Sequence, residues 1–286
     1  MIEREPVITR FAPSPSGRLH LGHAYAAMVA FDAARFSGGY FLVRMEDIDR
    51  GRCRAEFEDA IFEDLSWLGI TWAAPVVRQS DRMGTYSEAI ARLDKMGIIY
   101  PCFCTRVDIR GEIERSPTAP HGPEGPVYPG TCRHIPHQER LERAARGEAH
   151  ALRLDIDKAL EITDPILTWN ERDEGMSRAY PQRFGDVVLA RKDTPTSYHL
   201  SVVVDDAAQG ITLVTRGRDL FDATGIHRLL QSLLGYPVPR YYHHKLITDD
   251  RGKRLATRDA SLSLETLRKN GSSPDYIRYL VGLAKS

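Results

Sequence analysis

Two histidines stand three residues apart at the expected start of a helix. The stretch from Arg10 to His23 reads R-F-A-P-S-P-S-G-R-L-H-L-G-H, and its prolines exclude a helix from the loop. An alanine-rich run after Gly22 favours a helix. Because a helix N-terminus presents unpaired N–H groups and a positive dipole end, we predict that His20 and His23 help to hold a polyphosphate there. Taken alone, four residues of this kind fit a capped helix equally well.

Cysteines mark a second candidate site. Of the four cysteines, Cys102, Cys104 and Cys132 fall within one short region, whereas Cys53 stands apart. In a cytosolic chain such clustering indicates a metal site more than disulfides. Tetrahedral zinc needs a fourth ligand, for which His121 and His134 are candidates by chemistry. Three reduced, buried thiols are the alternative.

The elements that position these residues alternate between strand and helix. We predict strands at residues 7–11, 40–44, 151–154, 186–190 and 211–214. We predict helices from Gly22 to Ser37 and at 55–68, 83–96, 138–146 and 224–234, with one or two short helices in 264–283. Residues 79–81 offer a cap for the third helix. Such an order indicates an α/β fold, whose ligands bind beyond the carboxyl ends of the strands.

The amino-acid composition of the chain changes at Tyr100. The following segment is rich in proline and glycine, and a long loop of this kind is usually functional or stapled, here by an ion. We expect a Rossmann-like catalytic domain in two halves, 1–99 and 181–245, interrupted by a zinc-stapled α+β insertion at 100–180. Residues 246–286 form a basic loop and a short helical segment in this interpretation.

Composition narrows the class of protein. The chain has 286 residues and a formal net charge of zero, which argues against non-specific coating of nucleic acid but allows a local basic face. No apolar run approaches the roughly 20 residues of a membrane span, and the N-terminus has no signal-peptide core. We therefore expect a cytoplasmic protein without a membrane partner.

The run from Arg10 to His23 resembles the H-I-G-H region of class I aminoacyl-tRNA synthetases, and its R-F-A-P-S start resembles the glutamyl branch. The resemblance implies that His20, Gly22 and His23 contact ATP, carried with Mg²⁺, and that the histidines stabilise the charge that develops during adenylate formation. It also implies a glutamate pocket, whose residues here are Arg10, Ser14, Glu46, Tyr198 and Arg216.

The roles in that pocket follow from chemistry. Arg10 and Arg216 are suited to clamp carboxylates bidentately. Glu46 accepts from the α-ammonium, and Tyr198 donates to the side-chain carboxylate. Taken alone, each of these residues is more often a surface ion pair, or a tyrosine with its hydroxyl at a rim, than a ligand-binding group.

The second motif of the family, K-M-S-K-S, has a divergent counterpart in R-L-A-T-R, residues 254–258. The expected ATP contacts there are Lys253, Arg254, Thr257 and Arg258. Thr257 stands where the family has its second lysine, which predicts slower activation if the charge of the leaving group stays unmet. A solvated basic loop is the alternative.

Short relatives of glutamyl-tRNA synthetase carry C-x-C…Y-x-x-x-C, in which a tyrosine phenolate completes the zinc site. The resemblance therefore implies Cys102, Cys104, Tyr128 and Cys132 as ligands of a structural zinc ion.

The chain ends 28 residues after Arg258, so we expect no separate anticodon-binding domain. It resembles the truncated paralogues that activate glutamate with ATP without tRNA and transfer it to queuosine at the wobble position of tRNA(Asp). The implied partner is the anticodon stem-loop, and we expect a monomer. Three alternatives stay open: a minimal glutamyl-tRNA synthetase charging the acceptor end, a nucleotidyltransferase, and an inactive zinc-bearing RNA-binding module.

Overall fold

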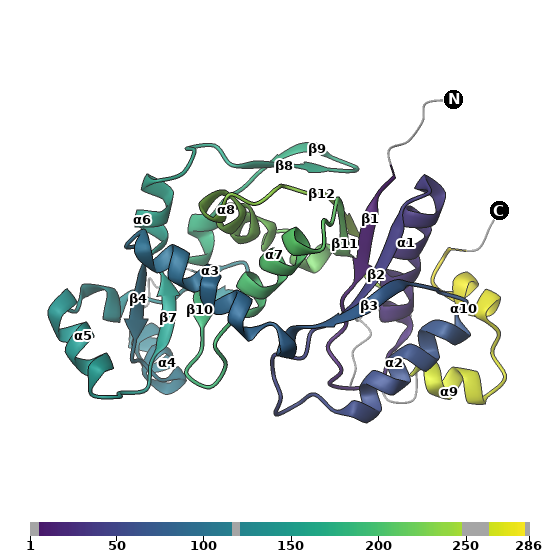
Figure 1. Ribbon diagram of the computed structural model, residues 1–286, viewed down its shortest axis with the longest axis horizontal. Coiled ribbons are helices and arrows are strands. Elements are labelled where there is room, and N and C mark those ends of the chain that lie inside the picture. The colour runs from purple at the N-terminus through teal and green to yellow at the C-terminus, as the bar shows by residue number, and fades with distance from the viewer. Residues whose placement is uncertain (1–5, 116–120, 248–262, 284–286) are drawn as a thin grey trace.

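The computed structural model describes residues 6–115, 121–247 and 263–283. Its centre consists of two sheets that meet along one line (Figure 1). The first has the order β1-β2-β3 and is parallel throughout. These strands span Ile8–Phe11, Tyr40–Met45 and Ala73–Arg78.

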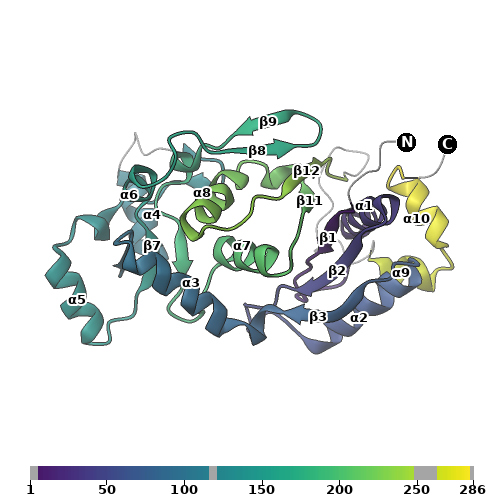
Figure 2. The same ribbon diagram turned by 45° about the horizontal axis from the view of Figure 1, so that its top comes forward.

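The second sheet has the order β11-β12-β8-β9 (Figure 2). Its strands span Leu213–Gly217, Arg240–His244, Thr168–Glu171 and Gly175–Arg178. The first three are parallel, and β9 is antiparallel to β8. The Thr212 amide donates to the Ile8 carbonyl at 3.0 Å, which joins β11 to β1. Strand order reverses at this junction, and open α/β sheets bind ligands at such a switch point.

Helix α1 (Leu21–Ser37) crosses from β1 to β2 and is buried along most of its length. Its alanines allow close packing against both sheets and against α10 (Pro274–Leu280). Gly38 ends the helix in the left-handed region, with φ 69°, where glycine carries no steric penalty. Helices α2 (Ala55–Trp67) and α9 (Leu264–Lys269) pack together at the same end of the molecule.

Helices α3 (Met83–Lys95), α7 (Tyr198–Ala208) and α8 (Thr224–Leu234) pack around the second half of the parallel sheet. Their apolar faces form the larger core with strands β8, β11 and β12. The Ser197 side chain caps α7 by accepting from the Leu200 amide. This cap places Tyr198 at the first position of the helix, beside the switch point.

An antiparallel sheet of order β10-β7-β4 lies at the far end of the molecule from α9 and α10 (Figure 1). Its strands span Val188–Ala190, Ala151–Leu154 and Ile99–Cys102. The smaller elements around it are α4 (Arg106–Arg115), the hairpin β5 (His121–Gly122) and β6 (Gly125–Pro126), α5 (His137–Ala145) and α6 (Ile156–Glu161).

The α/β class with a parallel sheet is confirmed, and the predicted helix at 224–234 coincides with α8. The proposed cap at 79–81 is wrong: these residues form a 3₁₀ turn, and Arg82 at the N-cap of α3 makes no side-chain cap. The sheets do not follow the predicted segments: β8, within the predicted insertion, joins the second sheet beside β12, whereas β10, from the predicted second half, joins the antiparallel sheet. Within the described ranges, no helix combines the length and apolar character that a bilayer span requires.

Candidate active site

The N-terminus of α1 is capped by its own two histidines. The Gly22 amide donates to Nδ1 of His20 at 3.1 Å, and the His20 amide donates to Nδ1 of His23 at 3.3 Å. The ring centroids lie 3.9 Å apart. Because both Nδ1 atoms accept, each neutral ring carries its proton on Nε2. The cap thus fixes the orientation of both rings at the positive end of the helix.

Gly22 leaves room for this arrangement. A Cβ atom at position 22 would lie 2.9 Å from Cε1 of His20 and 3.1 Å from its Nδ1. Behind the histidines, the Leu264 amide donates to the Leu19 carbonyl at 2.8 Å, and Ser263 forms a backbone bridge with His20. The start of α9 is therefore docked on the loop before α1. The predicted ATP contacts Lys253, Arg254, Thr257 and Arg258 lie outside the described residues.

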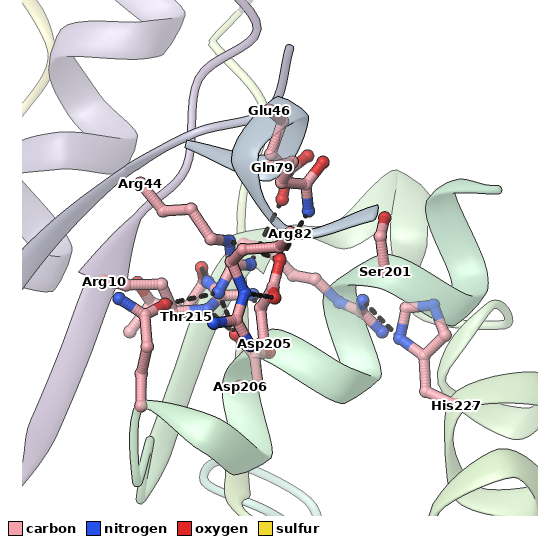
Figure 3. Close-up of polar contacts among 12 residues, drawn as sticks. Arg10, Arg44, Glu46, Gln79, Arg82, Ser201, Asp205, Asp206, Thr215 and His227 are labelled. Carbon is pink, nitrogen blue, oxygen red and sulfur yellow. Dashed lines mark hydrogen bonds and ion pairs between the residues drawn. The ribbon is translucent and has the colours of Figure 1, made fainter. Parts of the chain in front are cut away.

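Arg10 lies at the end of β1 with 5 % of its surface exposed. Asp206 of α7 accepts from its Nε at 2.9 Å and from its Nη2 at 3.2 Å, and the Thr215 carbonyl accepts from Nη1 at 3.2 Å (Figure 3). Asp206 therefore occupies one edge of this guanidinium. Burial raises the pKa of Asp206, but the charges of Arg10 and Arg44 more than offset it, so the net shift is downward.

Arg44 connects Asp206 to Glu46. Its side chain is fully buried on β2, donating to Asp206 Oδ1 at 2.8 Å and to Glu46 Oε1 at 3.1 Å. Glu46 follows β2 and keeps 15 % of its side chain exposed. Burial raises the pKa of Glu46, although Arg44 and Arg10 lower it in part. The carboxylate is thus held at the carboxyl end of β2, as predicted, and one oxygen is tied to Arg44.

Asp205, the neighbour of Asp206 on α7, is fully buried. It accepts hydrogen bonds from side chains that follow β3, in the N-terminal half of the parallel sheet domain. Its partners are Gln79 Nε2 at 2.9 Å and Arg82 Nε at 2.7 Å (Figure 3). The Tyr86 hydroxyl also donates to Asp205, at 2.8 Å. The two adjacent carboxylates of α7 therefore bind both halves of the parallel sheet together.

Arg216 has a different environment, although it is equally buried, with 6 % of its surface exposed. Its guanidinium donates to three neutral groups: His243 Nε2 at 3.0 Å, His227 Nδ1 at 2.9 Å and Thr224 Oγ1 at 2.6 Å. Within the described part of the chain, it forms no ion pair with a carboxylate. Burial and the charge of Arg216 lower the pKa of His243 to about 2 and that of His227 well below its ordinary value, so both rings are neutral acceptors.

Tyr198 lies between these groups. Burial raises the pKa of Tyr198; the charge of Arg216 lowers it, that of Glu46 raises it and that of Arg10 lowers it. All three charged groups therefore lie within electrostatic range of the phenol, which stays protonated and can donate. Ser14 is exposed, with its hydroxyl 3.7 Å from the Cys53 sulfur.

A cavity of about 990 Å³ opens beside Tyr198 and extends toward the antiparallel sheet. Its wall includes Asp49, Arg52, Phe103 and Tyr128. It is large enough for a nucleoside-sized group.

The three clustered cysteines converge. The sulfur atoms of Cys102, Cys104 and Cys132 all lie within 4.8 Å of one another. The Tyr128 hydroxyl lies 3.3 Å from the Cys102 sulfur and 3.5 Å from that of Cys104, and the sulfurs of Cys104 and Cys132 are 3.4 Å apart. Ligands of tetrahedral zinc stand roughly 3.5–3.8 Å apart, so this donor set fits the ion. His134 is exposed, and the side chain of His121 lies outside the described part.

Several site residues escaped sequence reasoning: Arg44, Gln79, Arg82, Glu171, Asp205, Asp206, Thr224, His227 and His243. The sequence signal for Asp205 and Asp206 was their position directly after three valines, because two acids beside an apolar run must find partners when they are buried. Arg44 had a similar signal as a cation in the apolar strand Y-F-L-V-R-M.

Comparison with known proteins agrees with this geometry. Residues 6–284 match the model of the tRNA synthetases class I (E and Q), catalytic domain. The chain therefore belongs to this family of ligases, which act on amino acid and ATP.

Within the family, the chain is 54 % identical to the glutamyl-Q tRNA(Asp) synthetase of Rhodobacter capsulatus, over 97 % of this chain and 100 % of that one. It is 44 % identical to the enzyme of the same name from Nocardia farcinica, over 95 % of this chain and 82 % of that one. Among solved structures, a glutamate tRNA ligase from Elizabethkingia meningosepticum is similar, with a TM-score of 0.79 and 27 % identity. The match covers 97 % of this chain and 60 % of that one.

The contact that a side chain at position 22 would make with the His20 ring leads to a testable prediction. We expect Gly22→Ala to displace the His20 ring and lower the kcat of amino-acid-dependent ATP–pyrophosphate exchange roughly 10- to 100-fold, because small misplacements of catalytic groups are costly. The free energy of unfolding should change little, since the helix propensity of alanine offsets the loss of the His20 cap. Gly84→Ala, near the start of α3 where a new Cβ meets nothing within 4 Å, is the matched control. Wild-type kcat in folded Gly22→Ala would contradict the role of His20.

Proposed function

We propose that this protein activates glutamate with ATP, without tRNA, and transfers the glutamyl group to queuosine at the wobble position of tRNA(Asp). The family supports the first step, and the relatives named glutamyl-Q tRNA(Asp) synthetase support the second. The observation that carries the choice of amino acid is the buried Arg216, whose hydrogen-bond partners are all neutral.

An uncompensated buried cation is costly, so its retention indicates a ligand of opposite charge. Arg216 has five N–H groups, of which three are used, which leaves one on each terminal nitrogen for a carboxylate. Tyr198 adds a neutral donor beside it. The side-chain carboxylate of glutamate satisfies this end of the pocket, whereas the amide of glutamine offers no charge.

The α-amino end lies toward the switch point. Glu46 retains an oxygen for an α-ammonium, and Arg10 keeps two N–H groups beyond those taken by Asp206 and Thr215. Ser14, on the exposed loop after β1, completes the set. The amino acid thus spans from Arg216 to the junction of β1 and β2, with its α-carboxylate toward α1.

Chemistry then follows from position. An oxygen of the α-carboxylate attacks the α-phosphorus of ATP, the bond to the bridging oxygen breaks, and pyrophosphate leaves with that electron pair. The N-terminus of α1, with His20 and His23, stabilises the charge on the phosphates. The leaving pyrophosphate would be bound by the Mg²⁺ that ATP carries and by Lys253, Arg254, Thr257 and Arg258. A hydroxyl of the queuosine base next attacks the glutamyl carbonyl, loses its proton and displaces AMP.

The 990 Å³ cavity beside Tyr198 is where we place this acceptor base, with the anticodon stem-loop against the surrounding surface. The proposal includes a division into two catalytic halves, an insertion and a C-terminal segment. Strands β8 and β9 belong to the second catalytic half in this division, because they pair in one sheet with β11 and β12.

Arg216 supplies the first test. Arg216→Lys keeps the charge but loses the planar fork, so the KM for glutamate in tRNA-free pyrophosphate exchange should rise about 10- to 100-fold, equivalent to about 1.5–3 kcal/mol. The KM for ATP should stay within about twofold. Arg218→Lys, an exposed ion-pair residue two positions away, is the matched control. An unchanged KM for glutamate in Arg216→Lys would rule out this pocket.

Transfer is tested with three RNAs. Base-sensitive labelling by [¹⁴C]glutamate should appear on tRNA(Asp) that contains queuosine and not on tRNA(Asp) that lacks it or on tRNA(Glu). Labelling of tRNA(Glu) instead would identify a minimal glutamyl-tRNA synthetase. Exchange of pyrophosphate without glutamate would favour a nucleotidyltransferase, and no exchange would favour an RNA-binding module.

We also propose that Cys102, Cys104, Tyr128 and Cys132 hold a structural zinc ion. Without an ion, burial raises the pKa of Cys104 to about 12, so a bound cation is what would keep the thiol of Cys104 ionised. The Arg153 guanidinium lies 3.8 Å from the centre of the Tyr128 ring and orients it. Zinc would link β4 to the loop that carries Tyr128, on the wall of the cavity.

The zinc proposal predicts about one zinc ion per purified chain by elemental analysis. Tyr128→Phe keeps the ring but removes the oxygen, so it should lose zinc to a chelator faster, and Cys132→Ser should contain little zinc. Chelation should lower the melting temperature, because metal binding contributes to folding. Cys53→Ser, which changes the cysteine outside the cluster, should behave as wild type. Zinc content unaffected by Cys132→Ser would refute the site.

A further inference from the structure

A carboxylate lies behind one of the rings that contact Arg216. Glu171, at the end of β8 and 1 % exposed, accepts from His243 Nδ1 at 2.7 Å and from the His243 amide at 2.9 Å. The indole nitrogen of Trp169 donates to it at 3.2 Å. Glu171 is one imidazole away from Arg216 rather than in contact with it.

These contacts fix the position of a proton. His243 donates through Nδ1 to Glu171, so its Nε2 has no proton and accepts from Nε of Arg216 at 3.0 Å. If His243 carried the proton on Nε2 instead, two N–H groups would face each other. The orientation of the arginine therefore depends on the charge of a residue that it does not touch.

A second ring repeats the pattern on the other side. His227 accepts from Arg216 Nη1 through Nδ1, so its proton lies on Nε2, which is 3.2 Å from Nδ1 of His199. Here the chain of rings ends at the cavity wall, where the exposed carboxylate of Glu124 lies 3.9 Å from Nε2 of His199. Among the described residues, the carboxylate behind the His243 branch is therefore buried and hydrogen-bonded, whereas the one at the end of the His227 branch is exposed and makes no hydrogen bond to the ring.

Indirect contact preserves the binding capacity of Arg216. Asp206 occupies a whole edge of Arg10, and a carboxylate placed directly on Arg216 would in the same way consume the donors that an anion needs. A carboxylate that acts through an imidazole instead orients the Arg216 guanidinium and offsets its charge at a distance, without taking up its N–H groups. In metal sites, the same pairing of a carboxylate with a histidine fixes the tautomer and the orientation of the ligating ring.

We propose that Glu171, acting through His243, is a positioning residue that holds Arg216 ready for the carboxylate of the substrate and so sets the preference for an acidic over an amide side chain. The inference rests on the proposed function, since it takes Arg216 as the group that binds glutamate.

The test is Glu171→Gln in the full chain, assayed by tRNA-free pyrophosphate exchange with L-glutamate and L-glutamine. The ring N–H groups of Trp169 and His243 donate to Oε2 of Glu171, and the His243 amide donates to Oε1, so a glutamine there turns its NH₂ toward a donor in either orientation. We expect the KM for glutamate to rise about tenfold or more, the preference for glutamate over glutamine to fall equally, and the KM for ATP to stay within about twofold. Glu161→Gln, an exposed glutamate of α6, is the matched control.

A KM for glutamate and a preference that both match wild type would overturn the proposal. If Glu171→Gln does not fold, the tautomer of His243 can be measured in the unaltered protein by ¹⁵N–¹H correlation spectra of the histidine rings. The signal of His243 is assigned by its loss in His243→Gln. The proton on Nδ1 supports the inference, and a proton on Nε2 overturns it. A wild-type protein without glutamate-dependent exchange would refute the proposed function instead, and the tautomer would still decide how Arg216 is held.

Discussion

One carboxylate, Asp206, joins the two halves of the parallel sheet. It lies on α7, beside β11, and binds two guanidiniums of the other half, Arg10 on β1 and Arg44 on β2. All three groups are largely buried, and removal of one partner from a buried pair typically costs about 3–5 kcal/mol. The halves also meet along β1 and β11 and through Asp205, and the Asp206 cluster fixes the distance across the switch point.

The same cluster explains how buried arginines in one pocket can differ in function. Arg44 is neutralised by Asp206 and Glu46, and Arg10 is partly neutralised by Asp206. Arg216 instead donates to neutral rings and a hydroxyl, so its positive charge remains available. A negative charge that enters the pocket therefore gains most at Arg216, and a positive charge gains most at Glu46. Glutamate has that polarity from its side chain to its α-amino group.

Local sequence predicted the parts of this arrangement that depend on local chemistry. Proline, glycine and alanine around His20 and His23 placed them at a helix start. The helix at 224–234 has the apolar periodicity that its packing requires and ends at Gly235 in the left-handed region. The clustered cysteines likewise came together.

The rest depends on partners that are distant in sequence. Arg44 finds Asp206 at a separation of 162 residues, and no local pattern specifies that pair. Helix α7 contains the β-branched run Val202–Val204, and its packing against α3 and α8 prevails over that local preference. Strand β8 has only four residues, and its pairing with β12 places Glu171 behind His243, a relation visible only in the folded chain.

A crystal structure of the protein with L-glutamate tests the central claim most directly. The account predicts the side-chain carboxylate on the two remaining N–H groups of Arg216, with the Tyr198 hydroxyl donating to it and the α-ammonium against Glu46. A glutamate bound in the reverse orientation, or one whose side-chain carboxylate makes no contact with Arg216, would contradict it.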